Sequence, residues 1–167
     1  MSRWSTAAER NRQTVAENAE RILSDTKYDG LRTPNALRSL VVAYAATTVA
    51  IPIAWLTGGA IAGILAVLAA TAVFLLLRVA VRSLADLPDH VLDERMRRDR
   101  DQVYVDAFRL VSTVVFVAAN LALVPVAFSD DATLTFDYHD VSAAYWTLLA
   151  VILGAPSVVL ALRRARD

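Results

Sequence analysis

The sequence predicts an all-α membrane protein with four transmembrane helices, arranged as two antiparallel hairpins. The first observation behind this prediction is that four long runs contain no Asp, Glu, Lys, Arg or His. They are 17, 18, 19 and 22 residues long, and a helix needs roughly 17–25 residues to cross a bilayer. Hydrophobic residues make up 56% of the chain, above the usual share for a soluble domain. The four runs are Leu40–Leu56, Ala60–Leu77, Leu110–Phe128 and Val141–Leu162.

The second observation is the placement of the 17 Lys and Arg residues, which all lie in residues 1–38, 78–109 and 163–167. The segment Ser129–Asp140 carries four Asp residues and no base, and the turn Thr57–Gly59 carries no charge. Bases stay on the cytoplasmic side of a membrane. We therefore expect a cytoplasmic N-terminus, middle segment and C-terminus.

These patterns divide the chain into five parts. The first 38 residues are too polar for a signal peptide, so we expect the first membrane helix to act as an uncleaved signal anchor. Cysteine is absent, which excludes disulfides and Cys-based metal sites. The parts are a cytoplasmic N-terminal segment with a short amphipathic helix (1–33), transmembrane hairpin 1 (34–82), a charged cytoplasmic linker helix (83–109), transmembrane hairpin 2 (110–162) with an external acidic loop (129–140), and a cytoplasmic tail (163–167).

Local signals refine the first hairpin. Thr33 followed by Pro34 suits a helix start, and Pro52 predicts a kink inside the first membrane helix. Small residues repeat at four-residue spacing, which favours close helix packing in lipid. We expect this packing within the chain, with self-association through one of the series as the alternative. The series are Ala46, Ala50 and Ala54; Ala62, Ala66 and Ala70; and the pair Gly59 and Gly63.

The charged linker offers the first candidate for chemistry. Asp89 and Asp93, and His90 and Glu94, are spaced to share a helix face, and together with Asp86 they could hold a divalent metal. However, Asp93 and Glu94 each precede an Arg by four residues, the favourable order for helix-stabilising ion pairs. We therefore expect a solvated helix that continues into the third span. A protein or headgroup contact and a metal site are the alternatives.

A resemblance to a known family rests on this linker. Leu87–Arg95 contains an Asp-Glu-Arg segment, and Arg97, Arg98, Arg100 and Tyr104 follow it. The stretch resembles small bacterial four-span membrane proteins of unknown function that carry such a segment in a cytoplasmic loop. The resemblance implies the general layout of the chain and no reaction. The excess of Arg over Lys, with abundant Ala and Val, also suggests a GC-rich bacterial genome.

Two further candidates are polar residues of the second hairpin. Asp137, His139 and Asp140 could bind a cation, although we expect an acidic loop whose aromatic side chains dip into the headgroups. Residues 133–139 alternate as a strand does. Asn120 is the eleventh of 19 residues in the third run. We expect it to bond a Thr, a Ser or a carbonyl of a neighbouring helix, with a ligand or ion contact as the alternative. The expected Thr partners are Thr47, Thr48 and Thr71.

The function classes follow from what the runs lack. A proton relay, pump or voltage sensor places an ionisable group inside the membrane, and none is present in the four runs. No phosphate loop, dinucleotide motif or zincin helix occurs. We expect a non-enzymatic protein of the bacterial inner membrane, without catalytic residues, cofactor or metal. It would act as a subunit, scaffold or regulatory partner of a larger membrane assembly.

The expected partners are the lipid bilayer and either a protein or a second copy that binds through the small-residue faces, and not nucleic acid. The main alternative function is a small oligomeric transporter or channel component. Its functional features would be Asn120, Pro52, Pro125 and the weak point between Gly154 and Pro156. A remote third alternative is a metal-dependent enzyme that acts on lipid headgroups through Asp89, His90 and Asp93.

Overall fold

The computed structural model describes residues 27–81, 92, 94–127 and 136–166, and these contain helices and no strand. The expected amphipathic helix at the N-terminus lies outside the described residues. The all-helical prediction is confirmed for the part of the chain that is described. The elements in order are the short 3-10 helix η1 (Asp29–Arg32) and the helices α2 (Pro34–Ala80), α3 (Glu94–Ala127) and α4 (Tyr138–Arg164).

In the part of the chain that the structure describes, three helices are long and apolar enough to cross a membrane, which supports a membrane protein. They cover Pro34–Ala80, Glu94–Leu121 and Tyr138–Arg164. The sequence predicts four such helices in two hairpins, and the described count is three. The difference arises because the first two apolar runs both lie in α2, which is 47 residues long. The connection between those runs is so short that helical structure continues up to and after Gly59.

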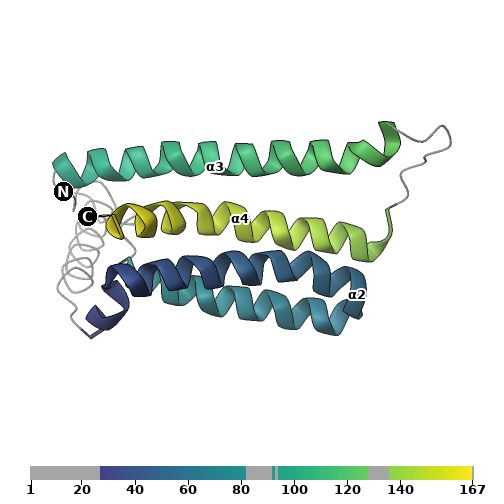
Figure 1. Cartoon of the computed structure of the whole chain (residues 1–167), viewed down its shortest axis with the longest axis horizontal. Coiled ribbons are helices and arrows are strands. Elements are labelled where there is room, and N and C mark those ends of the chain that lie inside the picture. The colour runs from purple at the N-terminus through teal and green to yellow at the C-terminus, as the bar shows by residue number, and fades with distance from the viewer. Residues whose placement is uncertain (1–26, 82–91, 93, 128–135, 167) are drawn as a thin grey trace, which may run out of the picture.

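The backbone of α2 leaves the helical region at Gly59, with φ 71° and ψ −167°. A positive φ is readily adopted by glycine alone, because a Cβ would clash. Beyond Gly59, α2 folds back along its own first half (Figure 1, dark blue and teal). The ring centroids of Tyr44 and Phe74 lie 6.2 Å apart across the two halves. Pro52 stays within the helix, so the only break in the helical backbone of α2 is at Gly59.

Side chains of unequal size fill the space between the halves of α2. Tyr44, Thr48, Ile51 and Trp55 are buried, at spacings of four, three and four residues. Of these, Trp55 packs against the second half, where a Cβ added to Gly63 would lie 2.4 Å from its ring, and Tyr44 lies near Phe74 of the same half. In the second half, Ala70 is buried and Ala62 and Ala66 are partly buried.

The first half of α2 therefore does not use its small residues for this contact. Ala46 and Ala50 are exposed and Ala54 is partly buried, so the expected packing of this series within the chain is wrong for Ala46 and Ala50. The reason is that large side chains occupy the inner face of the first half. They leave Ala46 and Ala50 on the outside of the bundle.

The helix starts follow recognisable capping chemistry. Thr33 caps α2 by accepting a hydrogen bond from the Ala36 N–H at 3.3 Å, and Pro34 takes the first position. Asp137 and Asp140 form a capping box at the start of α4. Tyr138 and His139 are therefore helical, and the strand-like alternation predicted for 133–139 is wrong for these residues. Residues 133–135 lie outside the described residues.

One end of each of the helices α2, α3 and α4 lies at the same end of the bundle. Figure 1 shows the start of α2, the start of α3 and the end of α4 on the same side. Two arginines close this end: Arg38 donates to the Ala165 carbonyl at 2.9 Å, and Arg164 donates to the Val81 carbonyl at 3.1 Å. We call this the basic end of the bundle. Its buried cluster contains Leu37, Tyr44, Leu77, Ala80, Val81, Leu92, Val103, Leu160, Ala161 and Ala165.

Candidate functional site

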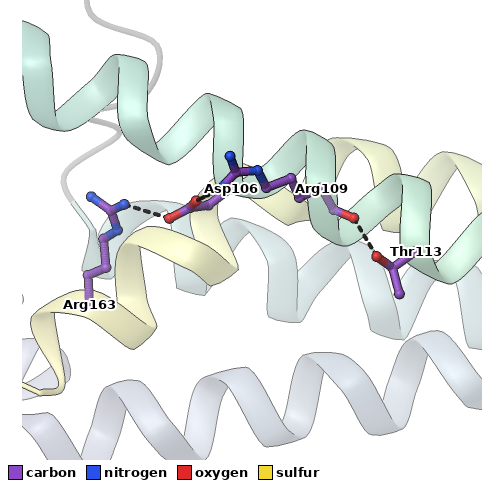
Figure 2. Close-up of polar contacts among 4 residues, drawn as sticks. All are labelled: Asp106, Arg109, Thr113 and Arg163. Carbon is purple, nitrogen blue, oxygen red and sulfur yellow. Dashed lines mark hydrogen bonds and ion pairs between the residues drawn. The ribbon is translucent and has the colours of Figure 1, made fainter.

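A cluster of one acid and two bases joins α3 to α4 at the basic end. Asp106 of α3 accepts a hydrogen bond from Arg163 of α4 at 2.5 Å, and Arg109 lies 3.6 Å from its other oxygen. Figure 2 shows the carboxylate between the two guanidinium groups. The side chains of Asp106 and Arg163 are each about a third exposed, at 36% and 31%. We call Asp106, Arg109 and Arg163 the inner ion-pair cluster.

Helix geometry explains why these residues meet. Val103 and Ala107 are buried, so the face of α3 that contains them lies against α4 and Asp106 flanks the contact. Arg163 lies in the last turn of α4, where a base is favourable beside the unpaired carbonyls. The cluster fixes the charged turns of α3 against the end of α4. The cluster consists of one carboxylate and two guanidinium groups, so its role is to hold the two helices in position.

The predicted metal candidate in the linker is only partly visible. Asp86, Asp89, His90 and Asp93 lie outside the described residues. Glu94 pairs with Arg98 at 2.7 Å in an exposed i,i+4 contact, as expected for a solvated helix. Within the described ranges, no group of three or more His, Asp or Glu side chains is arranged to hold a metal.

The external candidate is described in part. The Asp140 N–H donates to the Asp137 carboxylate at 2.9 Å, and the Asp137 N–H donates to the Asp140 carboxylate at 3.1 Å. The backbone bond from Asp140 is the main cause of a pKa for Asp137 below its usual 3.8. Both carboxylates therefore serve the start of α4.

His139, the third residue of that candidate, packs in an aromatic cluster. Its ring centroid lies 6.0 Å from that of Trp55 and 5.7 Å from that of Tyr138. The Trp55 Nε1 and His139 Nδ1 atoms are buried without a hydrogen-bond partner in the described structure. The cluster joins the outer end of α2 to the start of α4. The His139 ring therefore makes packing contacts, while its backbone and its charge also contribute to lowering the pKa of Asp137.

Asn120 does not make the predicted bond to a neighbouring helix. Its amide donates to the Phe116 carbonyl of its own helix at 2.8 Å, and the residue is exposed. Two of the three expected partners bond within their own helices: Thr47 donates to the Ala43 and Tyr44 carbonyls, and Thr71 to the Val67 carbonyl. The third, Thr48, is buried in α2. The prediction is wrong because α3 packs on α4 through its opposite face.

One interior contact was missed by the sequence reasoning. The Tyr44 hydroxyl donates to the Ala150 carbonyl of α4 at 2.7 Å. A Cβ added to Gly154 would lie 2.2 Å from the Tyr44 ring, so the glycine admits the ring. Gly154, predicted as a weak point of its helix, is thus a place of close approach between α2 and α4. Beside it lies an apolar cavity of about 70 Å³, lined by Tyr44, Ile51, Thr71, Phe74, Trp146 and Leu153, among others.

Asp106 and Arg163 were also missed. The available signal was an acid three residues before Arg109, close to the start of an apolar run. This spacing is equally typical of an ion pair on an exposed helix surface. Arg163, the partner of Asp106 in α4, is 57 positions away in the sequence. In the comparisons with known proteins, no family model, no curated protein and no solved structure matches this chain.

Proposed function

We propose that the chain is a non-enzymatic integral protein of a bacterial inner membrane that serves as a subunit, scaffold or regulatory partner of a larger membrane assembly. One observation carries this proposal. The charged turns at the start of α3 belong to the same unbroken helix as its apolar part, and the inner ion-pair cluster fixes them to α4. A charged surface held rigidly on a membrane helix is suited to binding a partner or passing on a change of position.

Four crossings of the membrane are part of this proposal. At 1.5 Å per residue, a straight helix of the length of α2 would measure roughly 70 Å, more than twice the ~30 Å hydrocarbon core. The break at Gly59 and the packing of the two halves support one crossing by each half. The grouping of α2, α3 and α4 ends at the basic end supports a cytoplasmic position for that end.

The proposed topology can be tested with single cysteines, because the chain has none of its own. Ser129→Cys is expected to react with a membrane-impermeant maleimide in intact spheroplasts. Arg166→Cys is expected to react only after the membrane is permeabilised. Reaction of Arg166→Cys in intact spheroplasts would overturn the orientation.

The proposed binding surface is the exposed part of α3 at the basic end. Its exposed side chains carry both signs of charge, which suits a protein partner of complementary charge pattern and disfavours a uniformly charged polymer. The exposed charged residues are Glu94, Arg95, Arg97, Arg98, Asp99 and Asp101.

The test is affinity purification after extraction in a mild detergent. A co-purifying protein is expected with the unaltered chain. Its recovery should fall with the double variant Arg95→Glu, Asp101→Arg and persist with the control Ser112→Ala. Ser112 lies on the same helix, exposed, within the apolar part. Recovery of the chain only as a free monomer, or equal recovery from all variants, would contradict the proposal.

The alternative function is a small oligomeric transporter or channel component. The exposed carboxamide of Asn120 within an apolar helix favours it, since polar groups at such positions often mark a path for solutes. Solute flux through reconstituted vesicles that Asn120→Leu abolishes would support this alternative. No flux above that of empty vesicles would leave the partner role as the better proposal.

A further inference from the structure

The outer half of α3 has no neighbouring helix within the described chain. Every described side chain from Ser112 to Leu121 is exposed, including the large Phe116 at 69% and Leu121 at 66%. The apolar side chains of this stretch are stable in contact with lipid tails. A carboxamide is not, because lipid tails can neither donate nor accept a hydrogen bond.

Asn120 is only partly satisfied in the described structure. One amide hydrogen is directed to the Phe116 carbonyl, and no other hydrogen bond of this side chain is present among the described residues. A carboxamide has two N–H donors and an oxygen with two lone pairs. One donor and the oxygen of Asn120 therefore await a partner at that depth.

Asn120 shares one face of α3 with three other residues. Arg109, Thr113, Phe116 and Asn120 follow one another at spacings of four, three and four residues. That is the spacing of a helix-pairing seam, in which Asn is a known determinant of register. At 100° per residue, these positions lie roughly 120–180° around the helix from the buried Ala107, which faces α4. We call these four residues the outward face of α3.

We propose that the outward face of α3 is the site at which a second copy of this chain binds, with Asn120 paired to Asn120 across a two-fold axis along the membrane normal. The inference rests on the proposed membrane crossing of α3. Copies inserted by the same signals share one orientation, so their Asn120 groups lie at one depth. A carboxamide is complementary to itself, since each copy supplies the donor that the other accepts.

The charges at the inner end of this face fit the same arrangement. Arg109 is 74% exposed and lies 3.6 Å from Asp106, a longer contact than the one Asp106 makes with Arg163. Asp106 flanks the outward face, so in a parallel pair each Arg109 can approach Asp106 of the second copy. Two crossed acid–base contacts would then accompany the Asn120 pair (Figure 2 shows Asp106, Arg109 and Thr113 along this side of α3).

Disulfide crosslinking in native membranes tests the proposal, because the chain has no cysteine of its own. Phe116→Cys leaves Asn120 in place and is expected to give a covalent dimer under mild oxidation. Leu68→Cys is the control, exposed on α2 and within an apolar run. Ala50→Cys tests the exposed small-residue face of α2 as the rival interface. Dimer from Ala50→Cys or Leu68→Cys at the level of Phe116→Cys, or none from Phe116→Cys, would overturn the proposal.

A second measurement keeps the result independent of the introduced cysteine. Donor- and acceptor-labelled copies are mixed in vesicles and diluted with lipid, and energy transfer gives the association constant. Asn120→Leu is expected to weaken association roughly 3- to 30-fold, the range for hydrogen bonds between membrane helices. Asn120→Gln should keep most of it, and Val115→Leu, on another exposed side of α3, should leave it unchanged. An association constant for Asn120→Leu equal to that of the unaltered chain would contradict the proposed pairing.

The two proposals fail separately. Loss of a co-purifying partner with an intact Phe116→Cys dimer would refute the partner role alone. Monomers that still retain a partner through the charged turns of α3 would refute the pairing alone.

Discussion

Among the described helices, α4 packs against α2 and α3, and it contacts them in different ways. Against α2, the Tyr44 ring occupies the space left by Gly154, and its hydroxyl bonds the Ala150 carbonyl. Against α3, the contact is made by Val103, Ala107 and the inner ion-pair cluster, and then it opens. Beyond that contact, an apolar groove of about 360 Å³ lies between α3 and α4. It is lined by Tyr104, Ala107, Phe108, Val111, Ile152, Ala155 and Pro156.

The difference shows what holds helices together when lipid surrounds them. Burying an apolar side chain against another helix gains little there, because lipid is as apolar as leucine. Close approach and specific polar contacts decide instead. The α2–α4 contact has both, deep in the bundle, whereas the α3–α4 contact has its polar part at one end only. We expect the first to be intolerant of added volume and the second to depend on one ion pair.

The largest expected effect is a change at Gly154. Gly154→Ala places a Cβ 2.2 Å from the Tyr44 ring, so either the ring or the helix must shift. We expect a loss of about 1–3 kcal/mol in the free energy of unfolding, the usual cost of overfilling a packed core. The cost of the clash should exceed the ~1 kcal/mol by which alanine is favoured over glycine in a helix, so the net effect of Gly154→Ala should be destabilising. Denaturant titration in mixed micelles measures it.

A second background tests whether the ring is the cause. In a chain that carries Tyr44→Ala, the same Gly154→Ala change should no longer destabilise. Its sign should reverse, because only the helix preference of alanine remains. If Gly154→Ala destabilises both backgrounds equally, the close approach of Tyr44 is not what limits this contact.

Sequence reasoning reached the helical class and the start of α2, because these depend on local chemistry. Thr33 and Pro34 start α2 as expected, and the charged turns continue into α3. The partners of Asp106 and Tyr44 lie 57 and 106 positions away, so no local pattern could name them. Asn120 was assigned to the interior because polarity suggested burial. Polarity indicates that a partner is needed and does not say which face of α3 meets α4.

The next effect in size concerns the α3–α4 contact. Asp106→Asn removes the charge that Arg163 pairs with, and both side chains are about a third exposed. We expect a loss of roughly 1 kcal/mol, at the upper end for ion pairs that water still reaches. The loss should shrink in high salt because the pair is partly screened.

The matched control lies twelve residues earlier on the same helix. Glu94 and Arg98 form an ion pair with side chains 83% and 78% exposed, which joins nothing but neighbouring turns. Glu94→Gln should therefore cost no more than about 0.5 kcal/mol. Equal losses for Asp106→Asn and Glu94→Gln would mean that the inner ion-pair cluster does not hold α3 to α4.

The smallest expected effect is at the outer end of α4, where Asp137 caps the helix beside the aromatic cluster. The pKa of Asp137 lies below 3.8, chiefly because its carboxylate accepts the Asp140 N–H. Since the folded value lies below the unfolded one, the cap stabilises the helix above pH 3.8 and the stabilisation is lost as the pH falls through the folded value. The amide resonance of Asp140, followed by NMR during acid titration, should shift with that transition.

The variant Asp137→Asn separates capping from charge. An asparagine caps a helix about as well as an aspartate but does not titrate. The Asp140 amide should keep its bonded chemical shift and lose the acid transition. Because the cap is local to the first turn, neither variant should alter the α2–α4 or α3–α4 contacts. A change in unfolding free energy comparable to that of Gly154→Ala would show instead that the outer end of α4 controls its contact with α2.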